Sequence, residues 1–142
     1  MFEYDAPFLF MVLPSGRRLA YLHPKVEKKL APWGDWVDNV TYMGTDQYTR
    51  SWTRISTFGG KWVEQACQGI ARDVQACGLE QADSIGFEIV GHTHDELIAL
   101  TAADDWRDEE VLSWCMYQPP PWADEKLFLD AEGFSDVIYR KD

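Results

Sequence analysis

The apolar and polar positions of the N-terminal half predict one hairpin followed by an irregular stretch. An apolar, β-favouring run spans Phe8 to Leu13, the turn-forming Pro14-Ser15-Gly16 follows, and alternating residues return from Arg17 to Leu22. This pattern predicts a β-hairpin. Between Pro24 and Asp46, Lys-rich pieces mix with Pro, Gly and Asp, which favours a connecting excursion with a short strand at Val40 to Met43.

The clearest helix is predicted from about Thr57 to Cys77, with Gly78 as its stop. Apolar residues recur there at spacings of three and four, and these are expected to face the core: Val63, Ala66, Cys67, Ile70, Ala71, Val74 and Cys77. The opposite stripe is rich in amides and consists of Lys61, Gln65, Gln68, Arg72 and Gln75. This stripe is either a solvated face or a binding face.

The C-terminal half predicts a second hairpin and an acidic helix. Residues 84–91 and 96–100 are β-prone runs with a polar tip between them, and residues 104–116 have an amphipathic helical pattern. Short β-like pieces are expected at 126–129 and 137–139. The fold class is therefore α+β, with a mainly antiparallel sheet and a long helix packed on one of its faces.

Composition limits the possible functions. The chain has 142 residues, which predicts a single domain over 1–142. Its 13 Lys and Arg against 24 Asp and Glu give a net charge of −11, which argues against a protein that holds nucleic acid by its overall field. The three cysteines, Cys67, Cys77 and Cys115, are odd in number and form no C-x-x-C pair, which argues against a disulfide framework and indicates a reducing cytoplasm. We expect no membrane span or secretory signal, because the apolar run at 8–13 is short and follows acidic residues.

The densest candidate chemistry lies in the sequence Gly91-His92-Thr93-His94-Asp95-Glu96. Alternate residues of a strand face one way, so His92 and His94 could share a face. Together with Asp95 or Glu96 they would then form part of a hydrolytic metal site that activates water. A metal-dependent hydrolase is one interpretation of this cluster. A polar hairpin tip without chemistry is another, although apolar arms on both sides would anchor the tip rigidly enough to present a carboxylate.

The order of these pieces resembles the C-terminal part of the palm in family A DNA polymerases, most closely the phage-encoded type. The strongest motifs are the helix segment Phe58 to Asp73 (FGGKWVEQACQGIARD) and the triplet His94-Asp95-Glu96. Supporting matches are Leu13 to Arg17, Tyr42 to Ser56 and the ending Tyr139-Arg140-Lys141. The resemblance covers nearly the whole chain.

This resemblance implies roles for four residues. Asp95 matches a ligand of the two Mg²⁺ ions that join the primer hydroxyl to the incoming nucleotide, and Glu96 matches its acidic catalytic neighbour. His94 and Gln68 match positions that contact the primer end and the DNA minor groove. Glutamine suits that contact because it can bond to minor-groove acceptors of any base pair.

The chain also departs from the family's pattern. The other catalytic aspartate and the nucleotide-binding fingers helix belong to earlier parts of the family's sequence and are not found here. Gln65 stands where phage-type relatives often have Asn, and Thr93 stands where an apolar residue commonly precedes the His. These differences make a somewhat altered function conceivable.

The leading hypothesis is a palm subunit or fragment of a split DNA polymerase, inactive alone. Its expected partners are a chain with the remaining palm, fingers and thumb, primer-template DNA and a dNTP. Its expected location is the cytoplasm of a bacterial host, with a phage or prophage origin. The alternatives are a non-catalytic, prophage-derived binding or inhibitor module and the metal-dependent hydrolase.

Overall fold

The computed structural model describes residues 1–124 and 126–139, which form two compact units, Met1–Ile70 and Ala71–Asp142. The strands and helices are β1 (Phe2–Asp5), β2 (Phe8–Val12), β3 (Arg18–Leu30), β4 (Trp36–Thr45), β5 (Trp52–Ser56), α1 (Gly59–Ser84), β6 (Glu88–Thr93), β7 (Glu96–Leu100) and α2 (Glu109–Tyr117). The predicted α+β class with a mainly antiparallel sheet is confirmed. The single domain and the palm-like architecture remain predictions.

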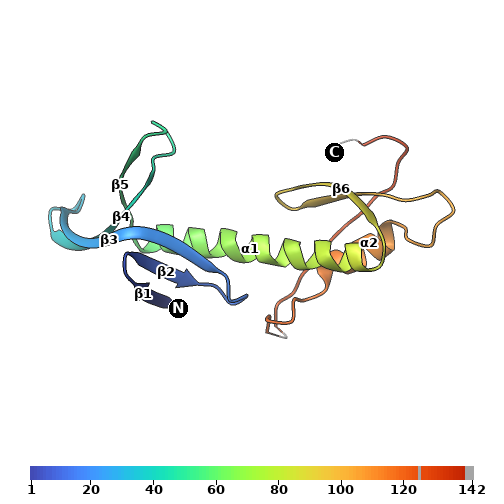
Figure 1. Cartoon of the computed structure of the whole chain (residues 1–142), viewed down its shortest axis with the longest axis horizontal. Helices are drawn as coiled ribbons and strands as arrows, with labels where there is room; N and C mark the ends of the chain where they lie inside the picture. Colours follow the sequence, from blue (N-terminus) through green and yellow to red (C-terminus); the bar gives the residue numbers. More distant parts are fainter. Residues whose placement is uncertain (125, 140–142) are drawn as a thin grey trace. The chain divides into compact units, whose positions relative to one another are not determined.

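The first unit is built on a five-stranded antiparallel sheet with the strand order β1-β2-β3-β4-β5 (Figure 1). The predicted first hairpin is confirmed: β2 pairs with the start of β3, from Phe8 opposite Leu22 to Val12 opposite Arg18. Gly16 has φ +84° in the connecting turn, a conformation that glycine adopts without steric cost. The turn-forming residues Pro14-Ser15-Gly16 therefore predicted the position of this hairpin correctly.

The prediction of an irregular excursion over Pro24 to Asp46 was wrong. Strand β3 continues through this region to Leu30 and pairs with β4, which is longer than the predicted short strand. The register shifts between Leu22 and Lys25, and such a bulge accommodates Pro24 within a strand. Beyond the bulge, Lys28 Nζ lies 2.7 Å from Asp38 Oδ1 across the strands.

Helix α1 packs its first half on this sheet with only part of the predicted face. Ala66 and Ile70 do contact the core formed by Met11, Leu13 and Tyr21, together with Trp62. Three residues expected in the core are instead exposed, namely Val63, Cys67 and Ala71. The helix is rotated about its axis relative to the prediction, so that the face with Gly69 lies against the sheet. A Cβ at Gly69 would lie 2.7 Å from Leu13 Cδ1, so glycine permits this close approach.

The predicted end of α1 at Gly78 was also wrong, since the helix continues to Ser84. The stop is Gly86, which has φ +93°. The Phe87 N–H donates to the Ala82 carbonyl at 3.1 Å, and the Gly86 N–H donates to Asp83 at 2.9 Å, the bonding pattern of a Schellman motif. Ala82 and Phe87 also belong to one core cluster, so the cap joins the helix end to the interior of the second unit.

The second unit combines the end of α1 with the β6–β7 hairpin and α2 around Ala82, Phe87 and Cys115. The predicted hairpin is confirmed. The acidic helix begins later than predicted, at Glu109, because Asp108 is its N-cap and accepts from the Val111 N–H at 3.0 Å.

Neither of the two short β pieces expected near the C-terminus is a strand in the described residues, 126–129 and 137–139. Arg140 and Lys141 lie outside the described residues. Among the described helices, none has both the length and the apolar content that a membrane crossing requires.

Gly78 and Gly59 provide a matched test of the packing of α1 on α2. A Cβ at Gly78 would lie 2.9 Å from Met116 Sδ and 3.3 Å from the Cys115 carbonyl oxygen, whereas one at Gly59 meets nothing within 4 Å. Gly78→Ala should therefore lower the free energy of unfolding by about 1–3 kcal/mol. Gly59→Ala should change it by less than about 1 kcal/mol, towards stability. Urea denaturation followed by circular dichroism measures both, and equal effects would contradict the close packing.

Candidate functional site

Three of the four predicted site residues lie together on the β6–β7 hairpin. Thr93 pairs with Glu96, which leaves His94 and Asp95 as a two-residue tip. Both tip side chains are exposed, and neither makes a hydrogen bond or ion pair within the part of the chain that the structure describes. The hairpin is anchored below the tip, where Ile89, Leu97 and Ala99 pack against the core of the unit. The tip therefore presents an exposed carboxylate and an exposed imidazole on a fixed support.

The carboxylate of Glu96 is in a different environment from that of Asp95. The Thr93 hydroxyl donates to Glu96 Oε2 at 3.1 Å, and the Tyr139 hydroxyl lies 3.1 Å from both carboxylate oxygens. This bond, which favours the protonated phenol, raises the pKa of Tyr139. Among residues 1–124 and 126–139, the carboxylate of Glu96 thus has hydrogen-bond partners and that of Asp95 has none. The sequence pattern does not predict this contact, because Tyr139 is separated from Glu96 by 43 residues.

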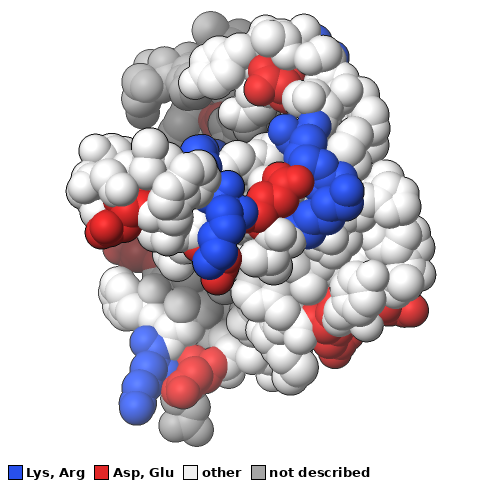
Figure 2. Space-filling model, turned by 90° about the vertical axis from the view of Figure 1, so that its left-hand side faces the viewer, with Lys and Arg blue, Asp and Glu red and all other residues white. Residues whose placement is uncertain are grey.

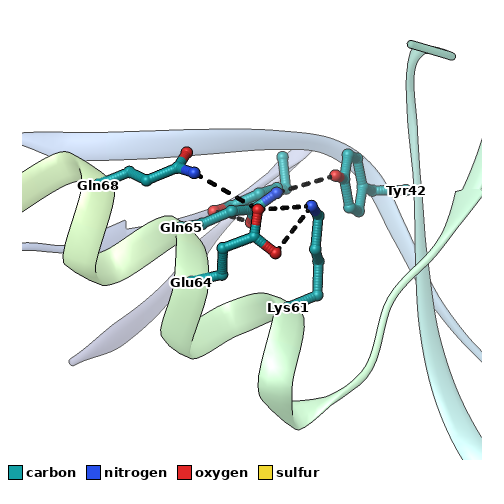
Figure 3. A network of polar contacts seen from close by, with 6 residues as sticks. Tyr42, Lys61, Glu64, Gln65 and Gln68 are labelled. Atoms are coloured by element: carbon teal, nitrogen blue, oxygen red, sulfur yellow. Dashed lines mark hydrogen bonds and ion pairs between the residues drawn. The ribbon is translucent and has the colours of Figure 1, made fainter. Parts of the chain in front are cut away.

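The fourth predicted residue, Gln68, lies on α1 in the first unit and is exposed (Figure 3). Its Nε2 donates to Glu64 Oε1 at 3.4 Å. Lys61 Nζ in turn contacts both oxygens of Glu64, at 2.9 and 3.0 Å. Because the Gln68 bond is long and exposed, the amide can exchange it for another partner at little cost.

The amide-rich stripe of α1 is not the uniform surface that its sequence pattern suggested. Gln65 is half-buried: it accepts from the Tyr21 hydroxyl at 2.8 Å and donates to the Tyr42 hydroxyl at 3.4 Å (Figure 3). Gln75 is only 5% exposed and donates to backbone carbonyls of the β6–β7 hairpin. Of the three glutamines in this stripe, Gln68 alone has a solvent-exposed side chain, because the other two satisfy interior groups.

The cluster of histidines does not form a metal site within residues 1–124 and 126–139. No group of three or more His, Cys, Asp or Glu side chains in these ranges is arranged to hold a metal ion. His92 and His94 are both exposed, as expected for a hairpin tip. The hydrolase interpretation therefore gains no support from this geometry.

The charges of the chain are distributed unequally. The first unit contains eight Lys and Arg against seven Asp and Glu, whereas the second contains five against seventeen. Figure 2 shows lysine and arginine side chains lying beside aspartates and glutamates rather than forming one broad basic patch. The net negative charge thus belongs to the unit that carries Asp95, and the first unit is close to neutral.

The chain is similar in sequence to a phage protein. The chain is 38% identical over 141 residues to the DNA polymerase of Bacillus phage SP02. The match takes in 99% of this chain but spans about a fifth (21%) of that polymerase. No family model and no solved structure matches the chain. The chain is therefore similar to a fragment of a phage DNA polymerase.

Tyr21 predicts a pH dependence of stability for the network around Gln65. Burial, with a smaller contribution from Tyr42, raises the pKa of Tyr21 to about 12. This folded-state pKa lies above the ordinary value of about 10, so the protonated phenol stabilises the fold fully below pH ~10. That stabilisation is lost as the pH rises through ~12. Urea denaturation at stepped pH should show this loss in the native chain and less of it in Tyr21→Phe.

Tyr48→Phe is the control for this measurement, since Tyr48 is 94% exposed. Its variant should keep the full alkaline loss of stability. A Tyr21→Phe chain with an unchanged pH profile would contradict the assignment.

Proposed function

We propose that this chain is the C-terminal palm portion of a phage-type family A DNA polymerase, acting with a chain that bears the remaining palm, fingers and thumb. The observation that carries the proposal is the 38% identity along almost the whole chain to a phage DNA polymerase. A segment matching a fifth of an enzyme is expected to supply part of its active site rather than a separate activity.

Asp95 is the proposed metal ligand. Mg²⁺ in nucleotide-handling sites is usually bound through one or two carboxylates plus substrate phosphates. The exposed carboxylate of Asp95 fits one such ligand, whereas Glu96 already accepts hydrogen bonds from Thr93 and Tyr139. The other ligands would come from the partner chain and the dNTP. Bound Mg²⁺ would supply activation of the primer hydroxyl and stabilisation of charge on the phosphate.

Gln68 and His94 are the proposed contacts to primer-template DNA. Each offers an exposed side chain that donates hydrogen bonds. The minor groove presents acceptors at every base pair, so an amide there adds affinity without reading sequence. The near-neutral charge of the first unit, which holds Gln68, suits such a contact better than the acidic second unit.

The proposed partner chain is supported by exposed aromatic residues. Trp33 and Trp36 are both more than 60% exposed, just before and at the start of strand β4 in the first unit. Val26 and Leu30 of β3 are also exposed, and Leu30 pairs with Trp36 across the strands. Apolar side chains gathered in this way usually mark a surface that another protein covers.

The metal role of Asp95 can be tested in a chimera, in which this chain replaces its matching segment in the SP02 polymerase. Asp95→Ala should lower primer extension on the order of 100-fold or more, because metal stabilisation of the transition state amounts to several kcal/mol. Asp104→Ala is the matched control, since Asp104 is an exposed carboxylate of the same unit outside the hairpin. Full activity of the Asp95→Ala chimera would refute the assignment.

A separate assay addresses the split organisation. The free chain is mixed with an SP02 polymerase that lacks the matching segment, and recovery of extension supports assembly in trans. Inhibition of the intact polymerase without any recovery would instead favour the inhibitor module.

Gln68→Ala should weaken primer-template binding about twofold to tenfold in the chimera, the effect of one neutral hydrogen bond. The loss should be equal on A·T-rich and G·C-rich templates, because the acceptors are common to both. The KM for primer-template on the two templates measures this, with Cys67→Ser as the neighbouring exposed control. A loss confined to one template would contradict the proposed contact.

A further inference from the structure

The two-residue tip of the β6–β7 hairpin has an unusual backbone. Two-residue hairpin loops favour turns in which the first or both central residues have positive φ, since these match the twist of the strands. Among the described residues other than glycine, only His23 and Arg50 have positive φ. His94 and Asp95 therefore lack positive φ, and their turn does not match the twist of the flanking strands. A further contact is needed to keep the ends of β6 and β7 paired.

Gln75 provides such a support from helix α1. Its Nε2 donates to the carbonyl oxygen of Thr93 and, at 3.2 Å, to that of Glu96. These two residues are the ones that flank the tip. The amide NH₂ has two hydrogens, which match the two carbonyl acceptors. The buried side chain of Gln75 thus hydrogen-bonds both ends of the turn to helix α1, and we call these two hydrogen bonds the Gln75 clamp.

We propose that Gln75 is a positioning residue that fixes the His94-Asp95 tip, and through it the Asp95 carboxylate. Turns with positive φ favour pairs such as Asn-Gly, Asp-Gly or Gly-Asp, in which one of the two tip positions is a glycine. The Gln75 contact allows a tip in which both residues carry functional side chains, His94 and Asp95. Only the catalytic consequence of this clamp rests on the proposed polymerase function; the clamp itself is a property of the second unit.

The first test measures amide hydrogen exchange by NMR in the whole chain without metal. Gln75→Met keeps the side-chain length and helix propensity but removes both donors. Exchange at the Glu96 and Leu97 amides should accelerate about tenfold relative to that at Ala99, as expected for the loss of bonds to the turn. Gln81→Met, on the same helix, should leave these rates unchanged. Unchanged rates in Gln75→Met would overturn the proposal.

A rescue experiment separates a positioning role from general destabilisation. Replacing the tip by His94→Asn and Asp95→Gly creates a turn that needs no clamp. In this background Gln75→Met should no longer accelerate exchange at Glu96 and Leu97. Equal acceleration in both backgrounds would mean that Gln75 supports the unit as a whole, and would overturn the specific role.

The consequence for catalysis is measured in the SP02 chimera. Gln75→Met should lower kcat about tenfold while the KM for primer-template stays within about twofold, because a misplaced metal ligand affects the chemical step rather than DNA binding. Accelerated exchange with an unchanged kcat would overturn the positioning of Asp95. A harmless Asp95→Ala would refute the polymerase function while leaving the exchange result to decide the clamp.

Discussion

The structure depends on a constraint that applies to the polar side chains of α1: an amide removed from water must find hydrogen-bond partners, or it costs about 1–3 kcal/mol. Gln65 meets this requirement in the first unit through Tyr21 and Tyr42, and Gln75 meets it in the second through the carbonyls of Thr93 and Glu96. Each amide therefore specifies which helix face is buried. Together with the close approach of Gly69 to Leu13, this accounts for the exposure of Val63 and Cys67, which hydrophobicity alone assigns to the core.

The fold was predictable where local chemistry agreed with packing, as in the hairpin over Phe8 to Leu22 and in the β6–β7 hairpin. It was not predictable in β3, whose outer part, Lys25 to Leu30, has exposed residues on both faces and so lacks the alternation of a half-buried strand. The pairing of Lys28 with Asp38 is visible only once the strands are aligned. Gly78 and Gly86 look equally able to end a helix in the sequence, and tertiary contacts decide between them: Gly78 permits close approach to Cys115 and Met116.

The candidate site divides in the same way. The hairpin tip at His94 and Asp95 follows from two apolar runs separated by polar residues, so its location could be read from the sequence. Its supports could not, because Gln75 lies 18 residues from Thr93 and Tyr139 lies 43 residues from Glu96. The excess of amides over charged residues in the stripe of α1 has two explanations. Two of its three glutamines bond to interior groups, and only Gln68 is exposed, as the proposed DNA contact requires.

The charge distribution connects the tip to its proposed ligand. A net charge of −11 argues against binding DNA through a general field, and the second unit carries all of the excess. Repulsion among seventeen carboxylates opposes the close approach of phosphates to Asp95 unless a cation intervenes. A divalent ion at Asp95 would reverse the local sign of the field, so that the same acidic surface that repels free DNA accepts a phosphate only at the metal. The acidity of this unit and a metal-dependent role for its tip are therefore mutually consistent.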